Sequence, residues 1–237
     1  MGTSKDYAGG KGGDWTPYRY ASTSFVKKGG GERADRLLAR YVGALGGAIA
    51  AAASGTGAVL APAQGLAGIG VGLAQRGLSP TLEELGLSHL VGADRYEVLD
   101  GLLDALAGDG STLEEQAVLS ALCEAFEELF PEDAETYEQL EAVSLDADGV
   151  IALIERFVVR WVYDRMLPTL AERLSHVEDP ETVRRRDSEL RERLALLAAL
   201  RLEDRDALTI DWAGEEGAAI LTSLVTDLYE DMADLED

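Results

Sequence analysis

The first group in this sequence that could take part in chemistry is the amine of Gly2, in the opening Met1-Gly2-Thr3-Ser4. Methionine before a small residue is normally removed, so we expect Gly2 to begin the mature chain. Such an end is either a handle for a partner or a modifying enzyme, or a frayed terminus without a role. N-myristoylation is not expected, because Asp6 stands where that pattern requires Ser or Thr.

Side chains that could carry catalysis are few and isolated. His89 and His176 show neither H-x-x-x-H nor H-E-x-x-H spacing. Cys123 lies among apolar residues at helical spacing, so we expect a small buried core residue rather than a nucleophile. The sequence has no G-x-S-x-G, no G-x-G-x-x-G and no phosphate-binding loop with its lysine. We therefore expect no catalytic residue, no metal site and no cofactor.

Residues 144–155 match a calcium-binding loop in part. Asp146 and Asp148 fall at positions 3 and 5, Gly149 at 6, and Glu155 at the bidentate position 12. Position 1 is Ser144 rather than Asp, which lowers the negative charge available to dehydrate Ca²⁺. The alternative is a turn that leads into a helix, with the two aspartates at its positive end. We favour the turn.

Residues 1–31 differ in composition from the rest of the chain. Eight of them are glycine, and five cations against two anions give a net charge of +3. The segment is also rich in aromatic residues, namely Tyr7, Trp15, Tyr18, Tyr20 and Phe25. Because so little apolar surface cannot offset the entropy lost on ordering, we expect a flexible, disordered Gly-rich tail followed by one domain over 32–237.

Acidic residues dominate that domain. The chain carries a net charge of −23, so residues 32–237 carry −26. A surface this acidic repels phosphate, which argues against direct binding of nucleic acid. The single cysteine excludes an intrachain disulfide framework and suits a reducing compartment. With no apolar secretory segment at the start, we expect a cytoplasmic protein.

Helical spacing of apolar residues recurs from Glu32 onward, and no alternating strand pattern appears. We therefore predict an all-α, multi-helix bundle. Ser111 and Glu114 predict a capping box at the start of one helix. Residues 146–174 are apolar on more than one side, which predicts a buried central helix that Pro168 kinks or splits.

Residues 41–75 contain no charged side chain and include two small-residue G-x-x-x-G patterns. A membrane-active hairpin is one interpretation. Against it, the segment is rich in Ala and Gly and is expected to break near residues 54–57 into two helices, each too short to span a bilayer. Two closely packed helices inside a soluble bundle explain it as well, and we favour that interpretation.

These features together resemble the QatB proteins of the bacterial Qat anti-phage defence system. The resemblance rests on Met1-Gly2-Thr3-Ser4 with its Gly-Gly tail, the Gly/Ala-rich segment 41–75, Gly110-Ser111-x-x-Glu114, and the buried helix with Phe157, Trp161 and Arg165. The tail departs from the pattern, because Trp15-Thr16-Pro17 stands where a more proline-rich run is expected.

The resemblance implies a non-enzymatic component that works with an ATPase, a QueC-like enzyme of deazaguanine chemistry and a TatD-like nuclease. QueC-like enzymes activate a carboxylate and condense it with an amine. Gly2 suits that role, because an α-amine has a pKa of about 7.7–8.0 and glycine has no Cβ to hinder attack. The expected partner-binding or modified residues are Gly2, Thr3, Ser4, Tyr7, Trp15 and Tyr18.

Three classes of function follow. A protein substrate or adaptor is the main hypothesis, a membrane-active effector using residues 41–75 is the alternative, and a small enzyme comes third because no nucleophile supports it.

Overall fold

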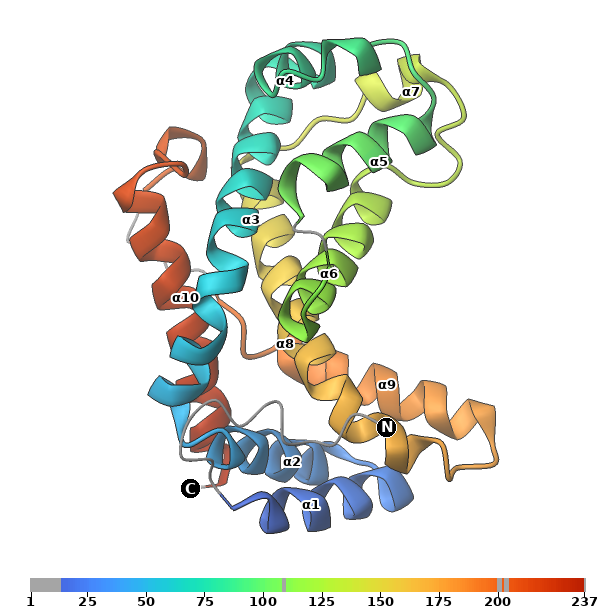
Figure 1. Cartoon of the computed structure of the whole chain (residues 1–237), viewed down its shortest axis with the longest axis vertical. Helices are drawn as coiled ribbons and strands as arrows, with labels where there is room; N and C mark the ends of the chain where they lie inside the picture. The colour runs from blue at the N-terminus through green and yellow to red at the C-terminus, as the bar shows by residue number, and fades with distance from the viewer. Residues whose placement is uncertain (1–13, 108–109, 200–201, 203–204, 237) are drawn as a thin grey trace. The chain divides into compact units, whose positions relative to one another are not determined.

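The structure is a computed structural model that describes residues 14–107, 110–199, 202 and 205–236 (Figure 1). Every regular element in these ranges is helical, which confirms the predicted all-α fold class. The α-helices are α1 (Trp15–Lys28), α2 (Gly31–Ala44), α3 (Ala48–Arg76), α4 (Leu78–Glu84), α5 (Arg95–Leu106), α6 (Leu113–Leu129), α7 (Tyr137–Glu141), α8 (Ala147–Leu174), α9 (Pro180–Ala195) and α10 (Glu215–Ala233). Short 3₁₀ turns are η1 (Ser88–Leu90), η2 (Ala207–Thr209) and η3 (Asp234–Glu236).

The described chain forms two compact units rather than the single domain expected for residues 32–237. Unit 1 combines the N-terminal residues up to 57 with 162–199 and 223–237, and unit 2 combines 58–161 with 200–222. Three of the four boundaries fall inside α3, α8 and α10, and the fourth follows Ala199, after the end of α9.

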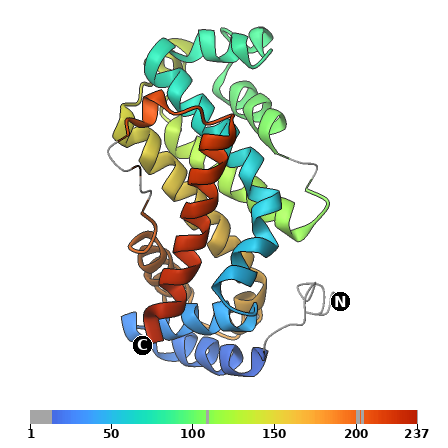
Figure 2. The same cartoon turned by 90° about the vertical axis from the view of Figure 1, so that its left-hand side faces the viewer.

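Unit 1 is built around the pair α1 and α2, which lie side by side in both views (Figures 1 and 2). Helix α9 contacts both of them, and η3, at the end of α10, contacts α2. Large side chains from α1, α2, α8, α9 and α10 are buried in this unit: Tyr18, Phe25, Leu37, Leu38, Tyr41, Val42, Tyr163, Met166, Leu190, Leu194, Leu228 and Tyr229.

The expected flexible tail over residues 1–31 is wrong from Asp14 onward. Asp14 caps α1, since its carboxylate accepts a hydrogen bond from the Thr16 backbone N–H at 2.8 Å. Pro17 is tolerated in the first turn because a backbone N–H at this position would have no partner within the helix, so the N–H that proline lacks is not missed. Apolar residues of α1 are buried, so packing provides the stability that composition alone did not suggest. Residues 1–13 lie outside the described part.

Unit 2 holds the first half of α8, which is buried as predicted for the segment 146–174. Ile154, Phe157 and Trp161 are all fully buried there. The helix is continuous to Leu174, so Pro168 does not split it. Other buried side chains of unit 2 include Leu66, Leu73, Leu82, Val98, Leu102, Val118, Leu122, Phe126, Phe130, Leu140 and Trp212.

The segment 41–75 also differs from expectation. Helix α3 is unbroken over 29 residues and continues through the predicted break at 54–57. Small residues allow close approach at two points in unit 2, where a Cβ added to Gly72 would come within 2.5 Å of Thr81 and one added to Gly65 within 2.4 Å of Leu106. Gly65 and Gly72 of α3 thus serve helix packing, whereas a Cβ added to Gly57 or Gly68 would meet nothing within 4 Å.

The capping box before α6 lies one residue later than predicted. Thr112, not Ser111, is the N-cap: its hydroxyl accepts from the Glu115 N–H at 3.1 Å, and its own N–H donates to the Glu115 carboxylate at 3.0 Å. Ser111 donates to the same carboxylate at 2.9 Å. Two overlapping S/T-x-x-E patterns made the register ambiguous in the sequence.

Candidate functional site

The candidate site lies at the start of α1, directly after residues 1–13. Trp15, Tyr18 and Tyr41 form an aromatic cluster there. The ring centroids of Trp15 and Tyr18 are 5.5 Å apart, and those of Tyr18 and Tyr41 are 5.7 Å apart. Such pairs add to the stabilisation from buried area. The cluster therefore attaches the first turn of α1 to α2.

Tyr18 also attaches α1 to α8. Its hydroxyl shares a hydrogen bond of 2.6 Å with the Thr169 hydroxyl, and its side chain is 2% exposed. Burial strongly raises the pKa of Tyr18, so it is neutral at all ordinary pH values. Tyr18 was predicted to contact a partner, but a buried side chain cannot do so. Trp15 is partly buried in the same cluster, whereas Gly2, Thr3, Ser4 and Tyr7 lie outside the described residues.

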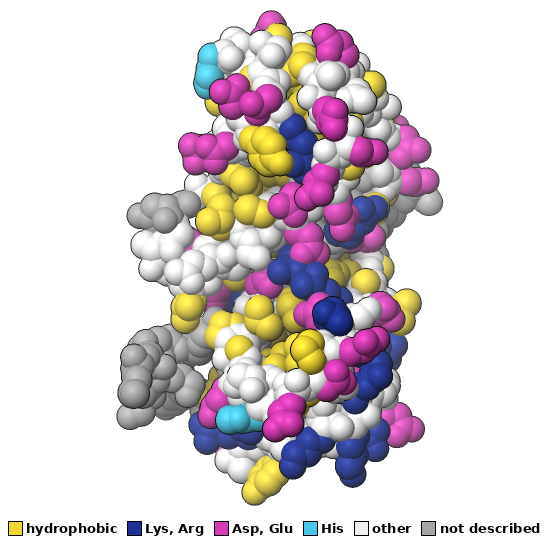
Figure 3. Space-filling view, turned by 90° about the vertical axis from the view of Figure 1, so that its right-hand side faces the viewer, with side chains coloured by type: hydrophobic (Ala, Val, Ile, Leu, Met, Phe, Trp, Pro, Cys, Tyr) yellow, Lys and Arg dark blue, Asp and Glu magenta, His cyan; other side chains and the backbone are white. Residues whose placement is uncertain are grey.

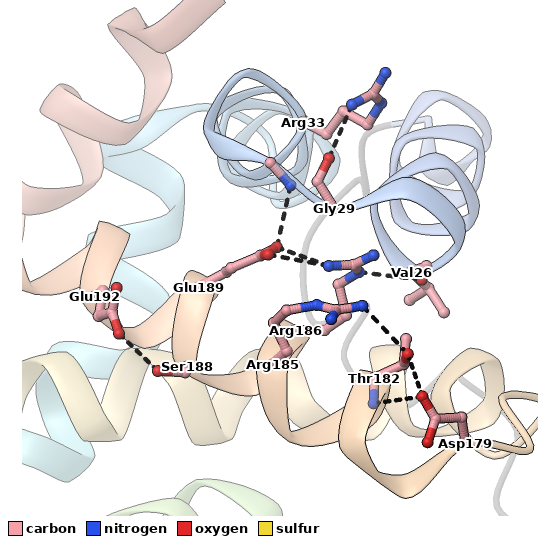
Figure 4. A network of polar contacts seen from close by, with 11 residues as sticks. Val26, Gly29, Arg33, Asp179, Thr182, Arg185, Arg186, Ser188, Glu189 and Glu192 are labelled. Atoms are coloured by element: carbon pink, nitrogen blue, oxygen red, sulfur yellow. Dashed lines mark hydrogen bonds and ion pairs between the residues drawn. The ribbon is translucent and has the colours of Figure 1, made fainter.

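The turn between α1 and α2 is held by two side chains of α9, as Figure 4 shows. Arg186 donates from Nε to the Val26 carbonyl at 3.3 Å and from Nη1 to both Glu189 oxygens at 3.0 and 3.1 Å. Glu189 also accepts from the Gly30 N–H at 3.1 Å. Gly29 adopts φ +62°, and a Cβ there would lie 2.0 Å from Arg186 Nη1. The turn therefore requires glycine for both its backbone angle and its space.

A second ion pair joins α9 to α2. Arg193 Nε bonds the carboxylate of Asp35, and both side chains are partly buried. The charged face of α9 therefore holds α1 and α2 in place, through Arg186 and Glu189 and through the pair of Arg193 with Asp35. Arg186 belongs to the basic triplet 184–186, and its side chain is buried in this network.

The outer face of α1 was not singled out from the sequence. Arg19, Tyr20, Lys27 and Lys28 are exposed on it, and Tyr20 is 76% exposed. Figure 3 shows Lys and Arg side chains, interspersed with Asp and Glu, on the lower part of the visible face. The sequence contains one sign of this face, because Arg19 and Lys27 are eight residues apart and therefore lie on the same side of a helix.

The partial calcium loop is a helix start. Helix α8 begins at Ala147, and the Gly149 N–H donates to the Asp146 carboxylate at 2.8 Å. Glu155 thus stands two turns inside a helix and cannot close a loop around an ion. Within the described ranges, no group of three or more His, Cys, Asp or Glu could hold a metal.

Glu141 and Cys123 are two further groups that the surrounding structure explains. Glu141 of α7 accepts from the Ser79 hydroxyl at 2.6 Å and from the Ser79 N–H at 3.1 Å, so it caps α4, whose N-cap Gly77 has no side chain to do so. Cys123 is partly buried, and burial together with the charge of Glu127 raises the pKa of its thiol, which leaves less of the nucleophilic thiolate.

Helix α3 is long and apolar enough to cross a membrane by length and composition, but half of its most apolar stretch is buried. A core helix of a soluble protein meets the same criteria, so this finding alone is weak support for a membrane role.

The fold and site define an all-helical protein with an N-terminal segment attached to a buried aromatic cluster. A family model described as Qat anti-phage system associated protein QatB matches residues 46–232. The chain belongs to the QatB family, and is thus a component associated with an anti-phage defence system. No curated protein and no solved structure matched the chain.

The match begins in the turn before α3, so residues 1–45 lie outside it. Three of the features that suggested the family fall inside the match, namely most of segment 41–75, Gly110 to Glu114, and Phe157 to Arg165. The opening Met1-Gly2-Thr3-Ser4 does not. The family match therefore does not extend to the N-terminal segment.

Proposed function

We propose that this QatB-family protein is a protein substrate or adaptor of its defence system, acting through the N-terminal segment that precedes Asp14. The observation that carries the proposal is the attachment of that segment. Asp14 caps α1, and Trp15 and Tyr18 fix the first turn to α2 and α8. A partner that takes hold of residues 2–13 therefore holds the whole of unit 1.

The length of this segment limits what it can reach. Residues 2–13 span about 40 Å when fully extended, at roughly 3.3–3.6 Å per residue. Five of these twelve residues are glycine, and they add no side-chain bulk that would block a narrow active-site channel. Tyr7 is the aromatic side chain in the segment that remains suited to binding a partner.

The proposed chemistry is amide formation at Gly2 by a QueC-like partner. The neutral amine nitrogen attacks the carbonyl carbon of an activated deazaguanine carboxylate, and the activating group leaves with its oxygen. The nitrogen then loses a proton, so an amide bond replaces the activated ester. An ATPase and a TatD-like nuclease complete the proposed set of partners, and the proposal places all of them in the cytoplasm and assigns no catalysis to this chain.

The test is substitution of Gly2 in cells that carry the complete operon. Gly2→Leu should abolish defence and leave the melting temperature unchanged, because residue 2 precedes the first described helix. Gly12→Leu is the matched control, since it places the same side chain in the same segment away from the amine. Full defence with Gly2→Leu would contradict the proposal.

A membrane-active effector is the second candidate, and the length of α3 is the observation that favours it. Flotation with lipid vesicles separates the two. The adaptor stays in the soluble fraction, whereas an effector that inserts α3 floats with the vesicles.

A further inference from the structure

The outer face of α1 carries basic and aromatic side chains, namely Arg19, Tyr20, Lys27 and Lys28. Two rows with a spacing of four residues run along it: Arg19, Thr23 and Lys27, and Tyr20, Ser24 and Lys28. No Asp or Glu occurs between Trp15 and Lys28. Within the part of the chain that the structure describes, Lys27 and Lys28 form no ion pair, and the charge of Arg19 acts on the Asp14 carboxyl at the start of the helix.

Charge is unevenly divided between the two units. Unit 1 contains 15 Lys and Arg against 18 Asp and Glu, whereas unit 2 contains six against 26. Most of the positive charge thus lies in the unit that carries the N-terminal segment. In a protein of net charge −23, an acid-free face of α1 is a local site for an acidic partner.

This face lies close to the point where the N-terminal segment ends. The segment joins the fold at Asp14, and Arg19 and Tyr20 come one to two turns later, roughly 8–9 Å along the helix axis. Helix α1 is about 21 Å long, so Lys27 and Lys28 lie within the footprint of an ordinary protein contact. An enzyme that draws residues 2–13 into its active site therefore comes to rest against α1.

We propose that the outer face of α1, formed by Arg19, Tyr20, Lys27 and Lys28, is the docking surface for an acidic face of the enzyme that takes the N-terminal segment. This inference rests on the proposed function. The cations steer the encounter, and Tyr20 supplies an aromatic contact that is 76% exposed in the free protein. A nucleic acid or a lipid bilayer fits less well, because either is extended and also meets the acidic remainder of the chain.

The test compares matched double variants of the full-length protein, with the QueC-like enzyme of the same operon as the probe. Arg19→Glu/Lys27→Glu reverses two charges on the proposed face. Arg184→Glu/Arg185→Glu reverses two exposed charges on α9 and is the control. The first pair should lower the association rate constant about tenfold or more at low salt and flatten its salt dependence, because steering by charge is screened by ions. The control should change it less than twofold.

Tyr20→Ala should raise the dissociation rate constant and leave the association rate constant nearly unchanged, since an uncharged contact does not steer. Circular dichroism melts verify that each variant is folded, and all the changed side chains are exposed. Mass spectrometry of Gly2 in cells carrying each variant gives a second readout, with slower modification expected for Arg19→Glu/Lys27→Glu alone.

The outcomes separate the two claims. If wild-type protein binds and is modified while both double variants behave alike, the docking surface is wrong and the proposed function stands. If wild-type protein neither binds the enzyme nor is modified, both fail. Binding of wild-type protein to a DNA duplex or to phosphatidylserine vesicles, lost in Arg19→Glu/Lys27→Glu without any effect on enzyme binding, would assign the face to that ligand and overturn the inference.

Discussion

Gly29 is a residue at which backbone and side-chain requirements coincide. Its φ of +62° is unfavourable for other residues, and an added Cβ would lie 2.0 Å from the Arg186 guanidinium. Gly29→Ala should lower the free energy of unfolding by about 1–3 kcal/mol, measured by urea denaturation. Gly31→Ala is the control two residues away. It has open space and lies in α2, so it should be neutral or stabilising by up to about 1 kcal/mol. Equal effects of the two changes would remove the role assigned to the turn.

Asp14 gives the start of α1 a dependence on pH. Hydrogen bonds from Thr16, through its side chain and its backbone N–H, lower the pKa of the Asp14 carboxyl below its ordinary value. A lowered pKa in the folded state means that the stabilisation is present above the ordinary Asp range, near about 3.9, and is lost as the pH falls through the folded-state pKa.

The Thr16 amide resonance should therefore shift only at acidic pH, and Asp14→Asn, which still caps the helix, should abolish that titration. A Thr16 amide that titrates identically in Asp14→Asn would show that another group is responsible.

Helix α1 is the element that the sequence did not predict. It carries one buried and one exposed tyrosine, whose substitutions can be compared directly. Tyr18 is 2% exposed and Tyr20 is 76% exposed on the same helix. Tyr18→Ala should lower the free energy of unfolding of unit 1 by about 3–5 kcal/mol, by analogy with other buried aromatic truncations. Tyr20→Ala should change it by less than about 0.5 kcal/mol. If residues 15–28 formed a flexible tail instead of a packed helix, neither substitution would change the free energy of unfolding.

The elements show which structural features a sequence can specify. The buried segment 146–174 was predictable because apolar residues surround the helix on several sides. Helix α1 was not, because Tyr18, Phe25 and Val26 are separated by hydroxyl residues and flanked by glycines, and its stability comes from α2 and α8. The continuity of α3 was missed because Ser and Gly at 54–57 resemble a break. Of the proposed site, the sequence identified Trp15 and Tyr18 as notable but could not show that Tyr18 is buried.

At the scale of the whole molecule, charge is the dominant feature. With a net charge of −23, and six Lys and Arg against 26 Asp and Glu in unit 2, repulsion among carboxylates opposes folding. Added sodium chloride should therefore raise the melting temperature by screening this repulsion. The surface ion pairs are too few to reverse the trend, since exposed pairs contribute about 0–1 kcal/mol each. A melting temperature that falls with salt would show that ion pairs outweigh repulsion.

The central claim concerns the whole molecule within its defence system, namely that the N-terminal segment is what a partner enzyme takes hold of and modifies. The most direct measurement is mass spectrometry of the N-terminal peptide from cells that carry the complete operon. The account predicts that the peptide begins at Gly2 and carries added mass on the Gly2 amine. Deletion of residues 3–13 should abolish defence and leave the melting temperature unchanged. A bare Gly2, together with full defence from the deleted protein, would contradict the account.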